Sequence, residues 1–502
     1  TTTIPKAPEQ LMVIANDFDR PIEPGSLPST LTVLRFGSYF NQRLIPGSIP
    51  ETVIEIVSGV WFNQPIEAGE LPPRLKSLTF GFYHDQRIPP HTLPNSLTEL
   101  TMGLKFSHLL ELHSLPSSIT SLSFKSLTEL SFGNGFNRKF EIGTLPNGLR
   151  SLKLGISYQQ VILPGVLPET LELLTIGSGS DQPIIPGALT GTSLTKLTLS
   201  EHYSQQIQPG SLPNTLTEFA LPDAFNQVLL QGALPTSITS LKMGKYFDLE
   251  IQPGSLPPTL ETLEFGYYYN QFIAPNSLPS TLRSLTFGHM YQHALMLGSL
   301  PQSLKLLTFG AMFNSLFDIG VLPSQLTSLS FGTNYNQPMT EGILPPSLRF
   351  LGIGALFANN PIVLPSQLHA LCIHTIDQWS NFNQVIPTTL SLLHIEYFVP
   401  CASREEVIRR ETATKPLVNH RLSRLTMEIT IQDDGTRVDL IDGLLMKQIV
   451  HLFPKVDTYN LKNEQPNSYV YNQCQCRLIQ SQLGLCQWNI EYQDRSNYFF
   501  LK

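Results

Sequence analysis

The stretch LPPTLETLEFGYYYNQFIAPNS, from Leu256 to Ser277, shows the unit from which most of this 502-residue chain is built. A leucine–proline step, once isoleucine–proline, returns every 22 residues from Leu27 to Leu344, with an eight-residue slip and one irregular repeat on the way. A fixed period in the twenties is typical of a solenoid, whose repeats contact only their neighbours. Within the unit, Leu260-x-x-Leu263-x-Phe265 predicts a short strand. We therefore expect a parallel sheet of about 17 strands with little helix, since 22 residues leave no room for a long one.

After the strand, each repeat carries a glycine, an aromatic residue followed by Asn or Asp, and a Pro-Gly turn. We expect a glycine such as Gly81 to mark a sharp turn without a Cβ, and an aromatic residue such as Phe40 to point into the core. The Asn or Asp side chain should hydrogen-bond the backbone of the adjacent turn, forming a ladder along the solenoid. The residues assigned to this structural ladder are Asn41, Asn63, Asn137, Asp181, Asn226, Asp248, Asn270, Asn314 and Asn336.

The outward-pointing strand residues are mostly Thr and Ser, interrupted by a few charges. Hydroxyl side chains first of all make a good β surface, while partners usually seek aromatic or charged hot spots. This face therefore fits packing against like surfaces at least as well as selective recognition. The candidate concave face consists of Arg35, Thr79, Thr101, Lys153, Thr175, Thr198, Lys242, Glu264, Thr286 and Thr308.

Composition excludes several classes of function. Only 14% of residues are charged and the net charge is −7, which argues against binding nucleic acid or an anionic membrane surface. No apolar run is long enough to span a membrane, and the first residues do not resemble a signal peptide. Five cysteines, all in the last third, indicate reduced thiols rather than a disulfide framework. We expect a cytoplasmic protein.

The composition changes near Glu396, where the repeat stops. Residues 396–502 carry 13 basic and 13 acidic residues, a far higher charge density than the repeats. Helices are predicted at 403–411 and 442–453, and strands at 422–431 and in several later stretches. We expect a solenoid over residues 1–395 and a small α+β capping domain over 396–502, which covers the apolar edge of the last repeat.

Candidate chemistry is sparse. Cys474, Cys476 and Cys486 match no standard zinc spacing and are interpreted as core thiols. His289 and His293 lie in a loop and are not assigned to a metal. The sequence contains no nucleophile elbow, phosphate-binding loop or HExxH motif, and no pair of carboxylates in a recognisable motif. The sequence predicts no enzyme, no cofactor and no metal site.

The consensus LPxSLTxLxFGxxFNQxIxPGS resembles the FNIP repeat, a leucine-rich-repeat variant of slime moulds and giant amoebal viruses, over roughly residues 4–395. The resemblance implies a leucine-rich-repeat solenoid and protein–protein interaction. Many viral members carry an N-terminal F-box. The residues before Leu27 are too few for one, so an N-terminal piece, an F-box or a cap, could lie outside this sequence.

Two functions remain open at this stage. The first is a non-enzymatic scaffold that binds another protein. The alternative is a self-assembling structural protein, such as a virion or fibril component of a giant virus, favoured by the low charge and the hydroxyl face. A scaffold would act in the cytoplasm, which is the host cytoplasm if the protein is viral. For the structural alternative, the expected location is the virion. Glycan binding would need surface aromatic residues, which the pattern does not separate from core ones.

Overall fold

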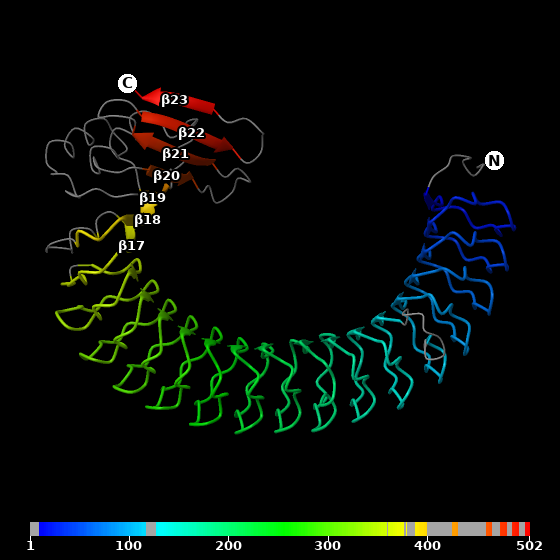
Figure 1. Ribbon diagram of the computed structural model, residues 1–502, viewed down its shortest axis with the longest axis horizontal. Helices are drawn as coiled ribbons and strands as arrows, with labels where there is room; N and C mark the ends of the chain where they lie inside the picture. The colour runs from blue at the N-terminus through cyan, green and yellow to red at the C-terminus, as the bar shows by residue number, and fades with distance from the viewer. Residues whose placement is uncertain are drawn as a thin grey trace. The chain divides into compact units, whose positions relative to one another are not determined.

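The computed structural model describes residues 10–116, 127–358, 360–375, 378 and 387–398, and beyond these the backbone of five strands. The chain divides into two compact units, Thr1–Gly266 and Tyr267–Lys502. In both, short strands alternate with turns and irregular coil (Figure 1). The predicted parallel β-solenoid with 22-residue coils and little helix is confirmed in these residues.

The first unit holds twelve strands in its described residues, each of three residues. In chain order they are β1 (Leu11–Val13), β2 (Val33–Arg35), β3 (Glu55–Val57), β4 (Ser77–Thr79), β5 (Glu99–Thr101), β6 (Glu129–Ser131), β7 (Ser151–Lys153), β8 (Leu173–Thr175), β9 (Lys196–Thr198), β10 (Glu218–Ala220), β11 (Ser240–Lys242) and β12 (Thr262–Glu264). Strands β1 to β9 pair in sequence order in one sheet, and β10 to β12 pair in the same parallel way. The strands line the inner side of this unit's curved stack (Figure 1).

The second unit continues the same pattern and then lengthens its strands. They are β13 (Ser284–Thr286), β14 (Leu306–Thr308), β15 (Ser328–Ser330), β16 (Phe350–Gly352), β17 (Ala370–Thr375), β18 (Leu392–Phe398), β19 (Arg424–Ile429), β20 (Thr458–Asn463), β21 (Asn472–Leu478), β22 (Gly484–Ile490) and β23 (Asn497–Leu501). Pairing is parallel from β13 to β20 and antiparallel from β20 to β23. The helices predicted at 403–411 and 442–453 lie outside the described residues, and the domain boundary near Glu396 stays a prediction.

The leucine–proline step starts each coil with a tight turn. The amide of Leu31 donates to the carbonyl oxygen of Pro28 at 3.1 Å, and Leu75 donates to Pro72 at the same distance. Proline suits the first position because the turn uses only its carbonyl oxygen and not an N–H donor. The turn carries Leu31 and Leu75 into the core, where neither is exposed.

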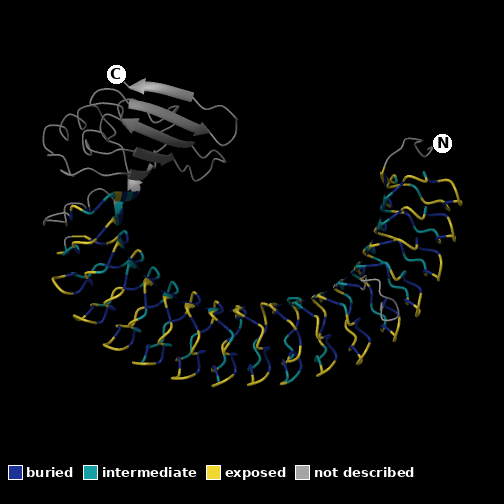
Figure 2. Ribbon diagram, viewed as in Figure 1, coloured by how far each residue is buried: buried dark blue, intermediate teal, exposed yellow. Residues whose placement is uncertain are grey.

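Nearly every coil places one ring at the same position, and many of these rings stack on the ring of the next coil. We call this row of rings the aromatic column. Its members in the first unit are Phe18, Phe40, Phe62, His84, Phe106, Phe136, Tyr158, Tyr203, Phe225 and Phe247, and in the second unit Tyr269, Tyr291, Phe313, Tyr335 and Phe357. Ring centroids are 6.2 Å apart for Phe40 and Phe62 and 5.9 Å apart for Phe313 and Tyr335, with nearly parallel planes. The column lies in the interior of the coils, where the buried residues of each repeat gather (Figure 2).

The glycine that follows most of the short strands is required by the close approach of the neighbouring coil. A Cβ on Gly155 would lie 2.1 Å from the carbonyl oxygen of Gly133, and one on Gly332 would lie 2.2 Å from that of Gly310. Neither glycine has a positive φ. The expected turn is present, since the amide of Tyr158 donates to the carbonyl oxygen of Gly155 at 3.3 Å. Glycine is needed there because successive backbones approach too closely for any side chain.

The sheet of the first unit is interrupted between β9 and β10. At this point Ser200 and Pro222 occupy the positions that glycine holds in most other coils. One extra residue near Thr190 also lengthens this coil, so that Leu174 pairs with Leu197 instead of with the residue 22 positions on. Just beyond these residues the two coils meet as elsewhere, since the amide of Ala224 donates to the carbonyl oxygen of Glu201 at 3.0 Å.

Candidate interaction surface

In strands β1 to β15 the third residue is exposed or half-buried on the strand face. Strand pairing aligns Arg35, Thr79, Thr101, Lys153, Thr175 and Thr198 in one row of the first sheet, with Ser131 between Thr101 and Lys153. Lys242 and Glu264 are partners in β11 and β12, and Thr286 and Thr308 in β13 and β14. These are the ten residues selected as the candidate concave face; Ser131 was missed because the repeat is written twice in this region.

A groove of about 700 Å³ runs along the ends of strands β4 to β8. One side of the groove is lined by strand residues and by the apolar residues that directly follow them. The strand residues are Thr101, Ser131, Lys153 and Thr175. Its other wall comes from the loops after the strands and consists of Phe82, Leu104, Asn134 and Ile156. The glycines Gly133, Gly155 and Gly177 line it between these walls. At these glycines the backbones of successive coils lie too close together for a side chain.

Charges near the groove are few and uncompensated. No carboxylate oxygen lies within 4.0 Å of the Lys153 nitrogen in the described part of the chain. Glu99 and Glu129 are direct partners at the start of β5 and β6, both exposed. Elsewhere on the strand face some charges form pairs, as in Arg35–Glu55 at 3.2 Å and Lys242–Glu264 at 2.6 Å. The groove region therefore offers the Lys153 ammonium and two adjacent carboxylates to a ligand.

Exposed aromatic side chains lie beside the groove. Trp61 and Tyr83 stack with their ring centroids 4.1 Å apart, and Trp61 is 46% exposed. Phe82, which lines the groove, is 38% exposed and has the Lys105 ammonium 5.9 Å above its ring. A second group in the other unit joins Tyr267 and His289, stacked at 4.6 Å. These residues are the surface aromatics that the repeat pattern alone did not distinguish from the column.

Eight of the nine Asn and Asp side chains selected for the ladder accept a hydrogen bond from the neighbouring coil. The side-chain oxygen of Asn41 accepts from the amide of Asn63 at 2.8 Å, and that of Asn314 accepts from Asn336 at 2.8 Å. Equivalent bonds are accepted by Asn63, Asn137, Asp181, Asn226, Asn270 and Asn336, and the Asp248 amide donates to Asn226. The following Gln often adds a second bond, as Gln64 does to Asn41 at 3.2 Å.

Two ladder members were not selected from the sequence. Asp19 accepts from the amide of Asn41 at 2.9 Å, and Asp85 accepts from that of Ser107 at 2.9 Å. Asp85 was missed because His84 precedes it where other repeats have Phe or Tyr. Spacing alone would have found it, since it lies 22 residues after Asn63.

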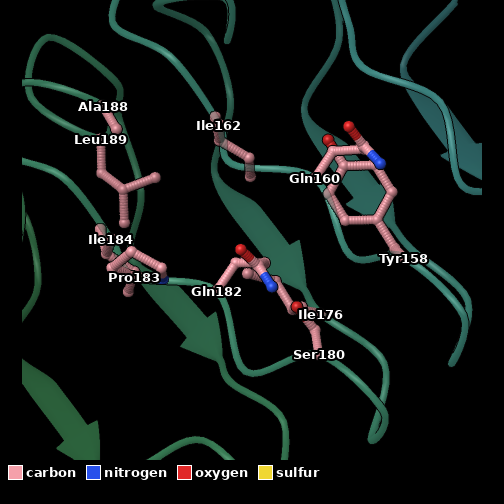
Figure 3. A pocket seen from close by; sticks show the side chains of 10 residues that line it. All are labelled: Tyr158, Gln160, Ile162, Ile176, Ser180, Gln182, Pro183, Ile184, Ala188 and Leu189. Atoms are coloured by element: carbon pink, nitrogen blue, oxygen red, sulfur yellow. The ribbon is translucent and has the colours of Figure 1, made fainter. Parts of the chain in front are cut away.

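Within the described residues, Ser180 stands where a ring of the aromatic column would be. The side chain there is buried, and a cavity of about 20 Å³ lies beside it, lined among others by Tyr158, Ile176 and Ile184 (Figure 3). On the far side, the amide of Ile184 donates to the hydroxyl of Tyr203 at 3.4 Å. The cavity is close to the smallest size that admits a water molecule. We read it as a packing defect.

The other candidate groups have separate surroundings. His289 stacks on Tyr267, whereas a ring nitrogen of His293 lies 3.0 Å from the carbonyl oxygen of Asn270. Cys372 is buried, and the backbones of Cys476 and Cys486 are partners in β21 and β22. Within the described residues, no group of three or more His, Cys, Asp or Glu side chains is arranged to hold a metal ion. The same residues include no helix long and apolar enough to cross a bilayer.

In-register short parallel strands, 22-residue coils and a side-chain ladder define a β-solenoid of the leucine-rich-repeat type. The chain belongs to the FNIP repeat family, whose model matches residues 18–57, 62–105, 84–126, 136–179, 181–223, 225–268, 251–290 and 291–334. The family of repeat proteins named from the sequence is thereby confirmed. No curated protein sequence matches the chain.

Among solved structures, the chain is similar to CroV588, a giant-virus protein described as a novel circular leucine-rich-repeat protein. The two are 33% identical with a TM-score of 0.72, over 86% of this chain and 61% of CroV588. This chain thus spans about three fifths of that protein's length. An internalin, InlF of Listeria monocytogenes, is 18% identical over 62% of this chain and 85% of its own, with a TM-score of 0.36, too low to support an argument.

Proposed function

We propose that this protein is a non-enzymatic scaffold that binds another protein through the groove along β4 to β8. The observation that carries the proposal is the groove itself. It places glycine backbone and Thr and Ser hydroxyl groups next to exposed aromatic side chains. Trp and Tyr dominate the energetics of protein interfaces because they bury large areas at low entropic cost. Catalysis has no support here, since the groove holds no paired acid and base.

The charges give the partner a recognisable chemistry. A segment with an apolar or aromatic side chain would contact Phe82 and Ile156. An acidic group would pair with Lys153, and a basic group would face Glu99 and Glu129. Because these charges are not paired within the described part of the chain, complementary groups would fix the register of the partner and suppress wrong ones. Nucleic acid is disfavoured, since a net charge of −7 and a groove lined by one lysine, Lys153, offer little to phosphates.

The test is capture of partners by the immobilised protein and by four variants. Phe82→Ser and Lys153→Glu change the groove, whereas Tyr246→Ser and Lys196→Glu change matched exposed residues on other coils. We expect each groove variant to weaken capture of a given partner by roughly tenfold or more, with the control variants unchanged. Equal capture by all five proteins would exclude the groove as the site.

The alternative is a structural protein that assembles with itself, as a virion or fibril component. A specific observation favours it: the turns opposite the strands carry exposed aliphatic side chains in consecutive coils. These include Leu112, Ile142 and Leu163 in the first unit and Leu297 and Ile319 in the second, between 51% and 74% exposed. Light scattering over a concentration series separates the two functions. A constant mass of one chain supports the scaffold, and concentration-dependent growth into ordered particles supports assembly.

The place of action follows from the same reasoning. A scaffold of this kind would act in the cytoplasm, that of the host if the protein is viral, and an assembly component would be found in the virion. The similarity to a giant-virus protein supports the viral setting.

A further inference from the structure

The turn that closes each coil requires a left-handed backbone, and two histidines occupy it in consecutive coils. Thirteen glycines in the described residues have positive φ, most of them at this turn position, such as Gly69 and Gly143. Only three other residues share this conformation there: His91 (φ 62°), His113 (φ 66°) and Asn276 (φ 62°). A side chain in this region costs free energy that glycine avoids, so its presence asks for an explanation.

Packing does not explain the two histidines. Both are exposed in the structure. At the same turn position, a Cβ added to Gly25, Gly69 or Gly165 would meet nothing within 4 Å. The side chains at this position therefore extend toward solvent and gain little from burial.

The backbone holds the two imidazoles next to each other. The amide of His91 donates to the carbonyl oxygen of His113 at 3.0 Å, which fixes the two turns side by side. The ring centroids are 5.5 Å apart, and the planes differ by 15°. Two imidazoles bound to one tetrahedral ion, with metal–nitrogen bonds of about 2.0–2.1 Å, have centroids roughly 5 Å apart. Rotation of the exposed rings about their own side-chain bonds would turn one nitrogen of each toward a shared ion.

We propose that His91 and His113 form a two-imidazole site for a divalent ion of the late first transition row, such as Zn²⁺, Ni²⁺ or Cu²⁺. Neutral imidazole nitrogen is a ligand that these ions prefer, whereas Mg²⁺ and Ca²⁺ take oxygen ligands. Two protein ligands leave the remaining positions to water. The site is open on the solvent side, and the backbone hydrogen bond sets its geometry before the ion binds. It does not depend on the groove or on the proposed scaffold function.

Isothermal titration with ZnCl₂ and NiCl₂ tests the site on the full chain. The variants His91→Asn and His113→Asn suit this purpose because Asn276 adopts the same backbone conformation at the equivalent turn. His202→Asn, which removes an exposed histidine from another coil, is the matched control. We expect one saturable equivalent in the wild type and in His202→Asn. Affinity should fall at least tenfold in each single variant, and no such binding should remain in the double variant.

Electron paramagnetic resonance of bound Cu²⁺ provides a readout that identifies the ligands. Coupling to two imidazole nitrogens in the wild type, and to fewer in either single variant, is the expected result. Equal binding by the wild type and the double variant would overturn the proposal, as would the absence of any saturable binding by the wild type. Thermal unfolding of all variants without metal checks that their folds are intact.

Discussion

The ring of His84 lies parallel to that of Phe80, with centroids 3.9 Å apart and planes within 3°. His84 is 1% exposed, and its Nδ1 atom is buried without a hydrogen-bond partner. It also stacks on Phe62 at 5.7 Å, in the place of a column ring. A titratable group has thus been built into the apolar column, where its charged form is not solvated.

This burial makes stability depend on pH. Desolvation lowers the pKa of His84 from 6.5 to about 4. Between these values the unfolded chain binds a proton that the folded chain does not, so stability is full above pH 6.5 and falls as the pH drops toward 4. The loss should reach about 3 kcal/mol. Urea unfolding of the wild type and of His84→Phe measures it. The difference between the two proteins should widen with acidification, and a constant difference would refute this account of His84.

Because a small cavity lies beside Ser180 in the aromatic column, a slightly larger apolar side chain at this position should stabilise the protein. Ser180→Val adds apolar volume beside a cavity of about 20 Å³ and should raise the free energy of unfolding by about 1 kcal/mol. Ser180→Phe would instead overfill it and cost about 1–3 kcal/mol, although Phe is the usual column residue. Urea midpoints of both variants check this. A gain for Phe would show that the neighbouring coils make room for a full ring.

A buried tyrosine hydroxyl in the column carries an avoidable cost. The hydroxyl of Tyr335 is buried without a partner, and burial raises the pKa of this phenol. Tyr335→Phe should therefore raise the free energy of unfolding by about 1 kcal/mol. Tyr203→Phe is the matched control, because the Tyr203 hydroxyl accepts from Ile184 and its loss should destabilise. Changes of the same sign in both variants would contradict this reasoning.

The glycine positions after the strands should not accept a side chain. Gly155→Ala places a Cβ against the carbonyl oxygen of Gly133 and should cost about 1–3 kcal/mol. The exposed neighbour Ser157 provides the control, since Ser157→Ala should change stability by less than about 0.5 kcal/mol. Chemical denaturation of the two variants measures their free energies of unfolding relative to the wild type. An Ala variant as stable as the wild type would mean that the coils separate easily at this point.

The repeat architecture could be predicted from the sequence because its signals are local. The leucine–proline step, the strand core around Leu263 and the Asn that follows each column ring recur at one spacing, so each repeat reinforces the interpretation of the others. The groove was not predictable, since it depends on how closely the backbones at Gly133 and Gly155 approach. The exposure of Trp61 and the burial of Phe62, adjacent in sequence, likewise follow only from the coil geometry.

Contacts between repeats were the hardest to foresee. His91 and His113 are 22 residues apart, and a search for metal-ligand spacings considers much shorter separations. Written in register, however, both replace the glycine of the Pro-Gly turn in successive repeats. The sequence therefore contains this alignment of the two histidines. The left-handed backbone, which shows that a side chain at this position costs free energy, can be seen only in the structure.

The central claim is that the groove along β4 to β8 receives another protein. A photo-crosslinking residue placed at Ser131, in the groove, tests it directly against one placed at Ser330. Both are half-buried third residues of their strands, but Ser330 does not line the groove. We predict a crosslinked product with a different protein from Ser131 and none from Ser330. Crosslinks from both positions alike, or from Ser131 only to a second copy of this chain, would contradict the claim.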